Sequence, residues 1–345
     1  MDKQKNLVIT GGGTGGHLMI AAALAEAAKE LGVKTIFIGS TKGQDRDYFA
    51  GSELFVATYF LETTGVVNKR GFGKVAALIK VLSGMLKVRK LFAKHQVCAV
   101  YSVGGFSAAS ASFAAVLFGK PLFIHEQNAA IGKLNGVLKR FSTEFISSYD
   151  PASPIREYPV RDIFFKKQRI RTKIKTIIFL GGSQGAKAIN DLALEVVPTL
   201  LQRGIKVIHQ TGKRDFQRVS AFYKEHNLDV IVFDFSTELV TFMDQADFAV
   251  SRSGASTLWE LCAMGIPALF IPYPYAAGDH QYYNAKYLVE NNLAYLARES
   301  EDPKATLFSV LQEDLEEKSK ALMGLTKQGV AKEMIQRVMQ KVEQC

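Results

Sequence analysis

Short apolar runs alternate with longer amphipathic segments along the chain, and the runs end in glycine or polar residues. In the first half they cover residues 7–10, 34–38, 99–103 and 121–124, and in the second half 176–180, 206–212, 231–235, 248–256 and 268–274. Short apolar runs that alternate with helical periodicity predict strand–helix–strand units and a parallel sheet. Because the alternation starts twice, we expect an α/β protein with two doubly wound, Rossmann-like domains and a cleft between them.

A break separates the two halves. Pro151, Pro154 and Pro159 interrupt the pattern, and the basic segment 166–175 follows without periodic apolar content. Prolines and polar residues between periodic segments are typical of a linker. We therefore expect the first domain to cover residues 1–158 and the second to begin at residue 159.

The first apolar run leads directly into a glycine cluster and then a helix. Such a turn lets the backbone approach a ligand, and the helix N-terminus favours an anion, most often a phosphate. Gly11, Gly13 and Gly16 also match the dinucleotide fingerprint G-x-G-x-x-G. That fingerprint needs an acidic residue where the second strand ends, but Gly39 and Ser40 stand there. The sequence therefore favours a phosphate-binding loop and disfavours NAD.

Composition limits the setting. The chain has 345 residues, of which 48% are hydrophobic. A chain of this length is too long for one ordinary core. Its cysteines, Cys98, Cys262 and Cys345, lack metal-like spacing and cannot form a full disulfide set. Residues 7–10 are too short for a signal peptide, and no apolar run reaches the about 20 residues of a membrane span. We expect a cytoplasmic protein that is soluble or peripheral to the membrane.

The formal net charge of +10 implies an acidic partner. Between Thr63 and His125 there is no Asp or Glu, whereas lysine and arginine recur, and residues 71–94 read as a helix with an apolar stripe. This helix could pack on the core with a basic outer face. Alternatively, it could press its apolar stripe into anionic lipid headgroups; nucleic acid ranks lowest, because no recognition module or stacking platform is present. The candidate membrane-docking residues are Lys74, Val75, Leu78, Ile79, Leu82, Leu86 and Lys87.

Seven motifs occur in a fixed order along nearly the whole chain. They are GGTGGH (12–17), HEQN (125–128), PVR (159–161), GGSQGA (181–186), HQTGK (209–213), SRSGAST with a following Glu (251–260) and HQYYNA (280–285). In this order they resemble the MurG family of peptidoglycan N-acetylglucosaminyltransferases. The resemblance implies a GT-B glycosyltransferase fold, with an acceptor and membrane-docking domain at 1–158 and a donor domain at 159–327. It also implies that the C-terminal helix, 328–345, packs back on the first domain.

The resemblance also implies a reaction. It is the inverting transfer of N-acetylglucosamine from UDP-N-acetylglucosamine to the 4-hydroxyl of undecaprenyl-pyrophosphoryl-N-acetylmuramoyl-pentapeptide, which converts lipid I to lipid II in cell-wall synthesis. We expect this hexosyltransferase at the cytoplasmic face of the inner membrane, with no cofactor and no obligatory metal. The alternatives are a UDP-N-acetylglucosamine 2-epimerase, another GT-B glycosyltransferase, or a nucleotide-sugar-binding or membrane-adaptor protein without catalysis.

The implied donor contacts lie mostly in the second half. Amides of the glycine turn and the Ser183 hydroxyl would bind the α-phosphate, Arg161 would stabilise charge on the leaving group, and Glu260 would accept bonds from the ribose hydroxyls. Gln281 and Asn284, three residues apart, would contact the sugar, and Ser236 would contact uracil through its main chain. The full set is Thr14, Gly15, Gly16, Asn128, Arg161, Ser183, Ser236, Ala255, Ser256, Thr257, Leu258, Trp259, Glu260, Gln281 and Asn284.

Attack by the acceptor hydroxyl needs a base, and His17 and Glu126 are the candidates. Histidine titrates near working pH, and the dipole of the helix that follows disfavours the imidazolium. His17 could instead bind phosphate or order the turn, and for Glu126 a structural carboxylate bonded to loop amides is favoured over catalysis. The expected acceptor and phosphate loops contain Gly12, Gly13, Gly104 and Gly105.

Asp45, Arg46 and Asp47 spell D-x-D, a metal–diphosphate signature in other glycosyltransferases. Here the triplet follows the second predicted strand of the first domain, far in sequence from the donor half. A solvated helix start is therefore the favoured interpretation, and no metal site is expected.

Overall fold

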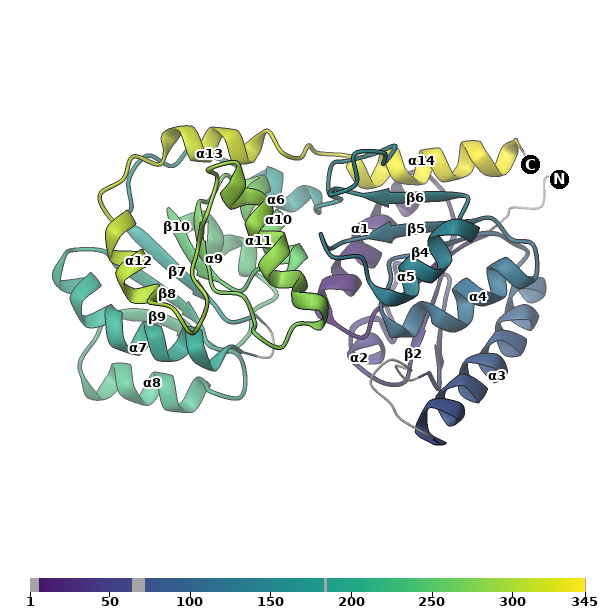
Figure 1. The fold of residues 1–345 in the computed structure, drawn as a ribbon, viewed down its shortest axis with the longest axis horizontal. Helices are drawn as coiled ribbons and strands as arrows, with labels where there is room; N and C mark the ends of the chain where they lie inside the picture. The colour runs from purple at the N-terminus through teal and green to yellow at the C-terminus, as the bar shows by residue number, and fades with distance from the viewer. Residues whose placement is uncertain (1–5, 64–71, 183–184, 345) are drawn as a thin grey trace. The chain divides into compact units, whose positions relative to one another are not determined.

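The computed structural model describes residues 6–63, 72–182 and 185–344, with backbone alone for residues 72–76. The chain divides into two compact units (Figure 1): residues 1–160 with 329–345 form unit 1, and residues 161–328 form unit 2. Each unit contains a six-stranded sheet whose paired strands are parallel. The predicted α/β class with two doubly wound units is confirmed.

The sheet of unit 1 has the strand order β3-β2-β1-β4-β5-β6. Its strands are β1 (Asn6–Thr10), β2 (Thr35–Ser40), β3 (Ala57–Leu61), β4 (Val97–Ser102), β5 (Leu122–Glu126) and β6 (Glu144–Ser147). Helices cover both faces of such a sheet, so its central strands are continuous apolar runs. The strand order reverses between β1 and β4, and ligands bind at the carboxyl ends of strands at such a switch point.

The helices of unit 1 are α1 (Gly15–Glu30), α2 (Asp45–Phe49), α3 (Phe72–Lys94), α4 (Ala109–Leu117), α5 (Lys133–Leu138) and α14 (Val330–Glu343), with 3-10 turns at Phe106–Ala108 and Lys139–Phe141. The C-terminal helix α14 lies within this unit and packs on α1 (Figure 1). Its buried face is Val330, Ala331, Met334, Ile335, Val338 and Val342, the spacing of an amphipathic helix. Arg337 fixes its outer side with two hydrogen bonds to Glu144, of 2.7 and 2.8 Å.

The sheet of unit 2 has the order β12-β11-β10-β7-β8-β9. Its strands are β7 (Thr176–Leu180), β8 (Lys206–Gln210), β9 (Val230–Phe233), β10 (Phe248–Ser251), β11 (Ala268–Phe270) and β12 (Tyr295–Leu296). Its helices are α6 (Asp162–Phe165), α7 (Lys187–Gln202), α8 (Phe216–Glu225), α9 (Leu239–Gln245), α10 (Ala255–Met264), α11 (His280–Glu290), α12 (Pro303–Val310) and α13 (Glu316–Met323), with a 3-10 turn at Ala277–Asp279. The order reverses between β7 and β10, which places the turn before α7 and the start of α10 at the switch point.

The basic segment 166–175 is not the linker that its composition predicted. Arg171 is fully buried, and its guanidinium donates to the carbonyls of Ala246 and Met264. Arg169 pairs with Asp247 at 2.9 Å. Composition alone misled because these arginines find acceptors far along the chain, including the last carbonyl of α10. The segment therefore belongs to the body of unit 2.

Candidate functional site

In unit 1, two glycine loops meet at the switch point. Gly12 and Gly13 have φ values of +154° and +85°, and Gly12 N donates to Gly104 O at 3.1 Å. A Cβ on Gly105 would overlap the Gly12 carbonyl. Side chains at these positions would thus push the loops apart or strain the backbone. The glycines that the sequence singled out bring the loop after β1 and the loop after β4 into direct contact.

Asp45 corrects a prediction. The D-x-D triplet was expected to be a solvated helix start, and α2 does begin at Asp45, but the side chain is fully buried whereas Asp47 is exposed. The Asp45 carboxylate accepts hydrogen bonds from Gly13 N at 2.5 Å and from Ser40 N at 2.8 Å. Burial raises the pKa of Asp45 and these bonds oppose the rise. Asp45 therefore anchors the glycine loop, since those backbone donors need an acceptor.

His17 lies in the first turn of α1 and is half-buried. Its Nδ1 is 2.9 Å from the hydroxyl of Thr14, and its Nε2 is 2.9 Å from the side-chain nitrogen of Gln127. Thr14 is exposed, whereas Gln127 is 6% exposed. The structure therefore brings together two predicted residues and Gln127, which the sequence reasoning missed although it lies inside the HEQN motif.

Glu126 ends β5 and is 2% exposed. Its carboxylate accepts hydrogen bonds from Asn128 N at 3.0 Å, Gly132 N at 2.9 Å and Asn135 Nδ2 at 2.9 Å. This is the geometry of a structural carboxylate that orders the loop after β5, and it ties down the predicted donor contact Asn128. Both carboxylate oxygens are therefore already engaged by donors of the protein.

In unit 2, α10 begins at Ala255 directly after the loop that follows β10. The first amides of a helix have no intrahelical acceptor and can bind an anion. Ala255, Ser256 and Thr257 supply this first turn. The side chains of Leu258 and Trp259 are 0% and 1% exposed, and Leu258 N already donates to Gly254 O at 3.0 Å.

Glu260 is 7% exposed on α10, so it is not a solvent-exposed helix carboxylate. Burial raises the pKa of its carboxyl to about 7, and the charge of Arg161 opposes this rise. The two residues that the resemblance assigned to the ribose and the diphosphate therefore interact electrostatically within one unit.

Other predicted donor contacts order loops. Asn284 is fully buried and donates to Ser253 O at 3.1 Å, just before α10. Gln281 accepts a hydrogen bond from Tyr273 N at 2.9 Å, and the Ser236 hydroxyl accepts one from Glu238 N at 3.0 Å. Ser183 lies outside the described residues.

Helix α3 carries two apolar faces. Ala77, Val81, Met85, Val88 and Phe92 are buried. On the other side Leu78, Ile79, Leu82 and Leu86 are each between 52% and 61% exposed. A core-packing helix accounts for the first face only. The adjacent Lys87 is exposed, and the side chains of Lys74 and Val75 lie outside the described residues.

Among the described helices, none combines the length and the low polarity that crossing a bilayer requires.

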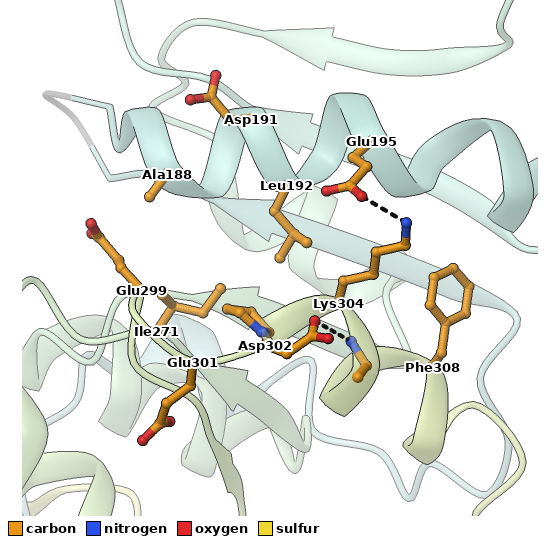
Figure 2. A pocket seen from close by; sticks show the side chains of 12 residues that line it. Ala188, Asp191, Leu192, Glu195, Ile271, Glu299, Glu301, Asp302, Lys304 and Phe308 are labelled. Carbon is orange, nitrogen blue, oxygen red and sulfur yellow. Dashed lines mark hydrogen bonds and ion pairs between the residues drawn. The ribbon is translucent and has the colours of Figure 1, made fainter.

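Unit 2 also contains a cavity of about 600 Å³. Figure 2 shows it between α7, α12 and the segment that precedes α12, with Lys304 paired to Glu195 at 2.6 Å. None of the predicted site residues is among the described residues that line it, and most of its charged lining is acidic: Asp191, Glu195, Glu299, Glu301 and Asp302. An acidic lining of this kind does not favour an anionic ligand.

Comparisons with known proteins agree with both halves of this arrangement. Residues 7–147 match the glycosyltransferase family 28 N-terminal domain, and residues 176–341 match the family 28 C-terminal domain. A protein of Sulfurimonas denitrificans is 59% identical over 95% of this chain and 97% of its own length. Its name is "UDP-N-acetylglucosamine--N-acetylmuramyl-(pentapeptide) pyrophosphoryl-undecaprenol N-acetylglucosamine transferase". A protein of Wolinella succinogenes with the same name is 52% identical over 95% of this chain and 98% of its own. This chain belongs to the MurG family.

Solved structures agree with this membership. The crystal structure of Acinetobacter baumannii MurG has a TM-score of 0.78 and 27% identity, and the match covers 99% of this chain and 100% of that one. The glycosyltransferase SnogD of Streptomyces nogalater has a TM-score of 0.66 at 14% identity over 99% of this chain and 100% of its own, a likeness of fold alone. The MurG-family chain is a glycosyltransferase with the GT-B fold, as predicted.

Proposed function

We propose that this MurG-family protein transfers N-acetylglucosamine from UDP-N-acetylglucosamine to the N-acetylmuramyl-pentapeptide carried on pyrophosphoryl-undecaprenol, in peptidoglycan synthesis. The observation that carries the proposal is the 59% identity over 95% of the chain to a relative whose name states this transfer. The acidic acceptor and donor also suit a chain with a net charge of +10.

The donor is proposed to bind unit 2. Amides at the start of α10, together with Arg161, would hold the diphosphate and stabilise the charge that develops on it. The Glu260 carboxylate would accept hydrogen bonds from the ribose hydroxyls. Asn284 and Gln281 support this site indirectly, because their side chains hold the loops before α10 and after β11.

The acceptor is proposed to bind the glycine loops of unit 1. Its 4-hydroxyl oxygen attacks C1 of the donor sugar, the bond from C1 to the diphosphate oxygen breaks, and UDP leaves with the electron pair. One in-line displacement inverts the configuration, so an α-linked donor gives a β-linked product. His17 accepts the hydroxyl proton as general base; Glu126 remains a structural carboxylate because its oxygens already accept loop amides.

Product analysis with a His17→Ala variant tests this mechanism. We expect wild type to form a β-1,4-linked disaccharide on a short-chain lipid acceptor, and H17A to lower kcat by about 10²- to 10⁴-fold, the usual contribution of a positioned base. The donor KM should change little, because His17 is proposed to act on the acceptor hydroxyl. Replacing the exposed His226 by alanine is the control. An α-linked product, or full activity of H17A, would overturn the mechanism.

We further propose that unit 1 docks on the cytoplasmic leaflet through α3. The exposed apolar stripe Leu78, Ile79, Leu82 and Leu86 would enter the headgroup region, and neighbouring lysines would each contribute about 1 kcal/mol on an anionic surface. A peripheral position of this kind would bring the glycine loops to an acceptor that cannot leave the membrane.

A further inference from the structure

Gln127 contacts the proposed base from the protein interior. It directly follows β5, is 6% exposed, and places its side-chain nitrogen 2.9 Å from His17 Nε2. Its Oε1 is buried and has no hydrogen-bond partner among the described residues. On the other side of the ring, His17 Nδ1 is 2.9 Å from the hydroxyl of the exposed Thr14. The imidazole thus has one nitrogen beside a buried amide and one beside an exposed hydroxyl.

This orientation of the amide fixes the ring proton. When the Gln127 amide donates to Nε2, that nitrogen must be unprotonated, so Nδ1 carries the proton and donates to Thr14. The remaining lone pair of the ring then accepts from the Gln127 amide and is not free for an acceptor hydroxyl. In this state His17 is well ordered but cannot act as a base toward a substrate.

A rotation of the Gln127 side-chain amide by about 180° exchanges its donor and acceptor and thereby moves the ring proton of His17 to Nε2. The oxygen and nitrogen of a glutamine amide occupy equivalent positions, and the terminal torsion is soft. The turn exchanges an unpartnered buried oxygen for an unpartnered N–H group, so the two orientations are similar in their cost. In the turned orientation Oε1 accepts Nε2–H, and the lone pair of the ring lies on Nδ1, beside Thr14.

We propose that Gln127 is the positioning residue that makes His17 a base: its Oε1 holds Nε2–H and thereby presents Nδ1 to the acceptor hydroxyl. This inference rests on the proposed function. The hydroxyl proton moves to Nδ1 as the hydroxyl oxygen bonds to C1 and UDP leaves with the electron pair. The resulting imidazolium keeps its Nε2–H bonded to the amide oxygen, so no second proton transfer is needed.

Titratable groups on neighbouring elements do not replace this amide. His125 on β5 is fully buried, and burial lowers its pKa to about 3, so it stays neutral over the working range. The Glu126 carboxylate is held by Gly132 N and by the side-chain amide of Asn135 on α5. The Asp45 carboxylate, at the start of α2, is held by Gly13 N and Ser40 N.

Kinetics of two variants test the proposal. Gln127→Met keeps the size of the side chain but offers neither donor nor acceptor. We expect it to lower kcat by about 10- to 100-fold, part of what a positioned base contributes, with little change in donor KM. Gln127→Glu can only accept, so it should keep more activity than Q127M. Its negative charge favours the imidazolium, so the acid limb of the kcat/KM profile should move to higher pH by about one unit.

Three controls separate this role from a structural one. Replacing the exposed Gln202 by methionine should leave kcat and the pH profile unchanged. Thermal unfolding shows whether the Gln127 variants remain folded. In the H17A background, Gln127→Met should cause no further loss of kcat, because a residue that acts through His17 has nothing left to position. An added loss in that background would mean a structural role and would overturn the proposal.

Nitrogen NMR of ¹⁵N-histidine-labelled protein gives a readout independent of turnover. With the His17 signals identified by their absence in H17A, wild type with bound acceptor analogue should show the proton on Nε2, and Q127M should lose that preference. A proton fixed on Nδ1 in both proteins would contradict the proposal. If H17A instead keeps full activity, the base assignment of the proposed function fails, whatever tautomer the NMR shows.

Discussion

Glu260 is 7% exposed, and burial raises the pKa of its carboxyl to about 7. The charge state of this residue therefore changes within the working range of the enzyme. In the proposed donor site, the ionised group above pH 7 would accept hydrogen bonds from two ribose hydroxyls, and the protonated group below pH 7 would accept fewer. Because the ionised form of this buried carboxyl would hold the donor better than the protonated form, donor binding should depend on pH.

We predict that the donor KM of wild type falls as pH rises through 7. Glu260→Gln should raise the donor KM about 10- to 100-fold above pH 7, since hydrogen bonds to a charged group are worth about 1.5–3 kcal/mol, and should remove its pH dependence. The matched control is Glu301→Gln in the acidic cavity of unit 2, which should bind donor normally. Steady-state kinetics between pH 6 and 8 measure both; a wild-type donor KM that does not vary with pH would contradict this role of Glu260.

Asp45 anchors the glycine loop that follows β1 in unit 1. We predict that Asp45→Asn lowers the free energy of unfolding by about 1–3 kcal/mol, because an amide can accept from only one of the two backbone donors and turns its NH₂ toward the other. kcat/KM should fall with it, because the loop carries Thr14 and His17. The neighbouring exposed Asp47→Asn should change neither quantity. Urea unfolding and steady-state kinetics of the two variants provide the comparison.

The sequence predicted the residues whose chemistry is local. The glycines of both loops, His17 and Glu260 stand out because their neighbours in sequence define them. Asp45 and Gln127 were missed or misread, since their partners lie 32 and 110 residues away. No local sequence pattern shows that the Asp45 carboxylate will accept a hydrogen bond from Gly13 N in the loop after β1.

Helix α3 shows what periodicity can and cannot tell. A period of 3.6 residues predicted the helix, but this segment has apolar residues on two faces, and periodicity does not say which one meets the core. The face that the sequence emphasised, with Ile79, Leu82 and Leu86, is exposed, and the face with Val81, Met85 and Val88 is buried. Only packing against the rest of unit 1 separates them.

We predict that the double variant Leu82→Glu, Leu86→Glu binds anionic phospholipid vesicles at least about 10-fold more weakly, because each leucine buried in the interface contributes up to about 1.5–3 kcal/mol. Its free energy of unfolding should change by less than about 0.5 kcal/mol, as for other exposed sites. The control Ile231→Glu replaces an exposed apolar residue on β9 of unit 2 and should bind normally. Vesicle co-sedimentation measures binding; an unchanged affinity of the double variant would rule out docking through α3.

Two buried, neutral histidines make the stability of the folded chain depend on pH. His125 lies on β5 of unit 1 and His209 on β8 of unit 2, and burial lowers the pKa of each to about 3 from 6.5. The ring nitrogens of His209 form hydrogen bonds with Tyr223 and Asn190. Above pH 6.5 these two imidazoles are neutral in both the native and the unfolded chain. Between pH 6.5 and 3 the unfolded chain binds protons that the native chain does not, so stability is lost as pH falls.

We predict a loss of up to about 1.4 kcal/mol per pH unit for each histidine in that window. The single tryptophan, Trp259, is buried in unit 2, so its fluorescence reports the unit that contains His209. Urea unfolding at pH 7.5 and 5.5 should show that His209→Asn depends less steeply on pH than wild type, by about one proton. Equal slopes would show that His209 does not hold this neutral state.

The repeat of two α/β units was predictable because fully buried parallel strands give continuous apolar runs. The strands β3, β6 and β12 escaped prediction: β3 is mostly half-exposed, β6 begins with the polar Glu144, and β12 has two residues. The basic segment 166–175 was misread for a related reason, since its arginines are satisfied by distant carbonyls. Sequence pattern thus predicted the units, and tertiary packing determined their edges.

Release of UDP from UDP-N-acetylglucosamine, measured with and without a short-chain analogue of the lipid-linked muramoyl-pentapeptide, tests the central claim most directly. We predict that UDP forms only when the acceptor is present, together with one β-1,4-linked disaccharide per UDP. Release that is equal without acceptor, accompanied by N-acetylmannosamine, would contradict the transferase and establish a 2-epimerase.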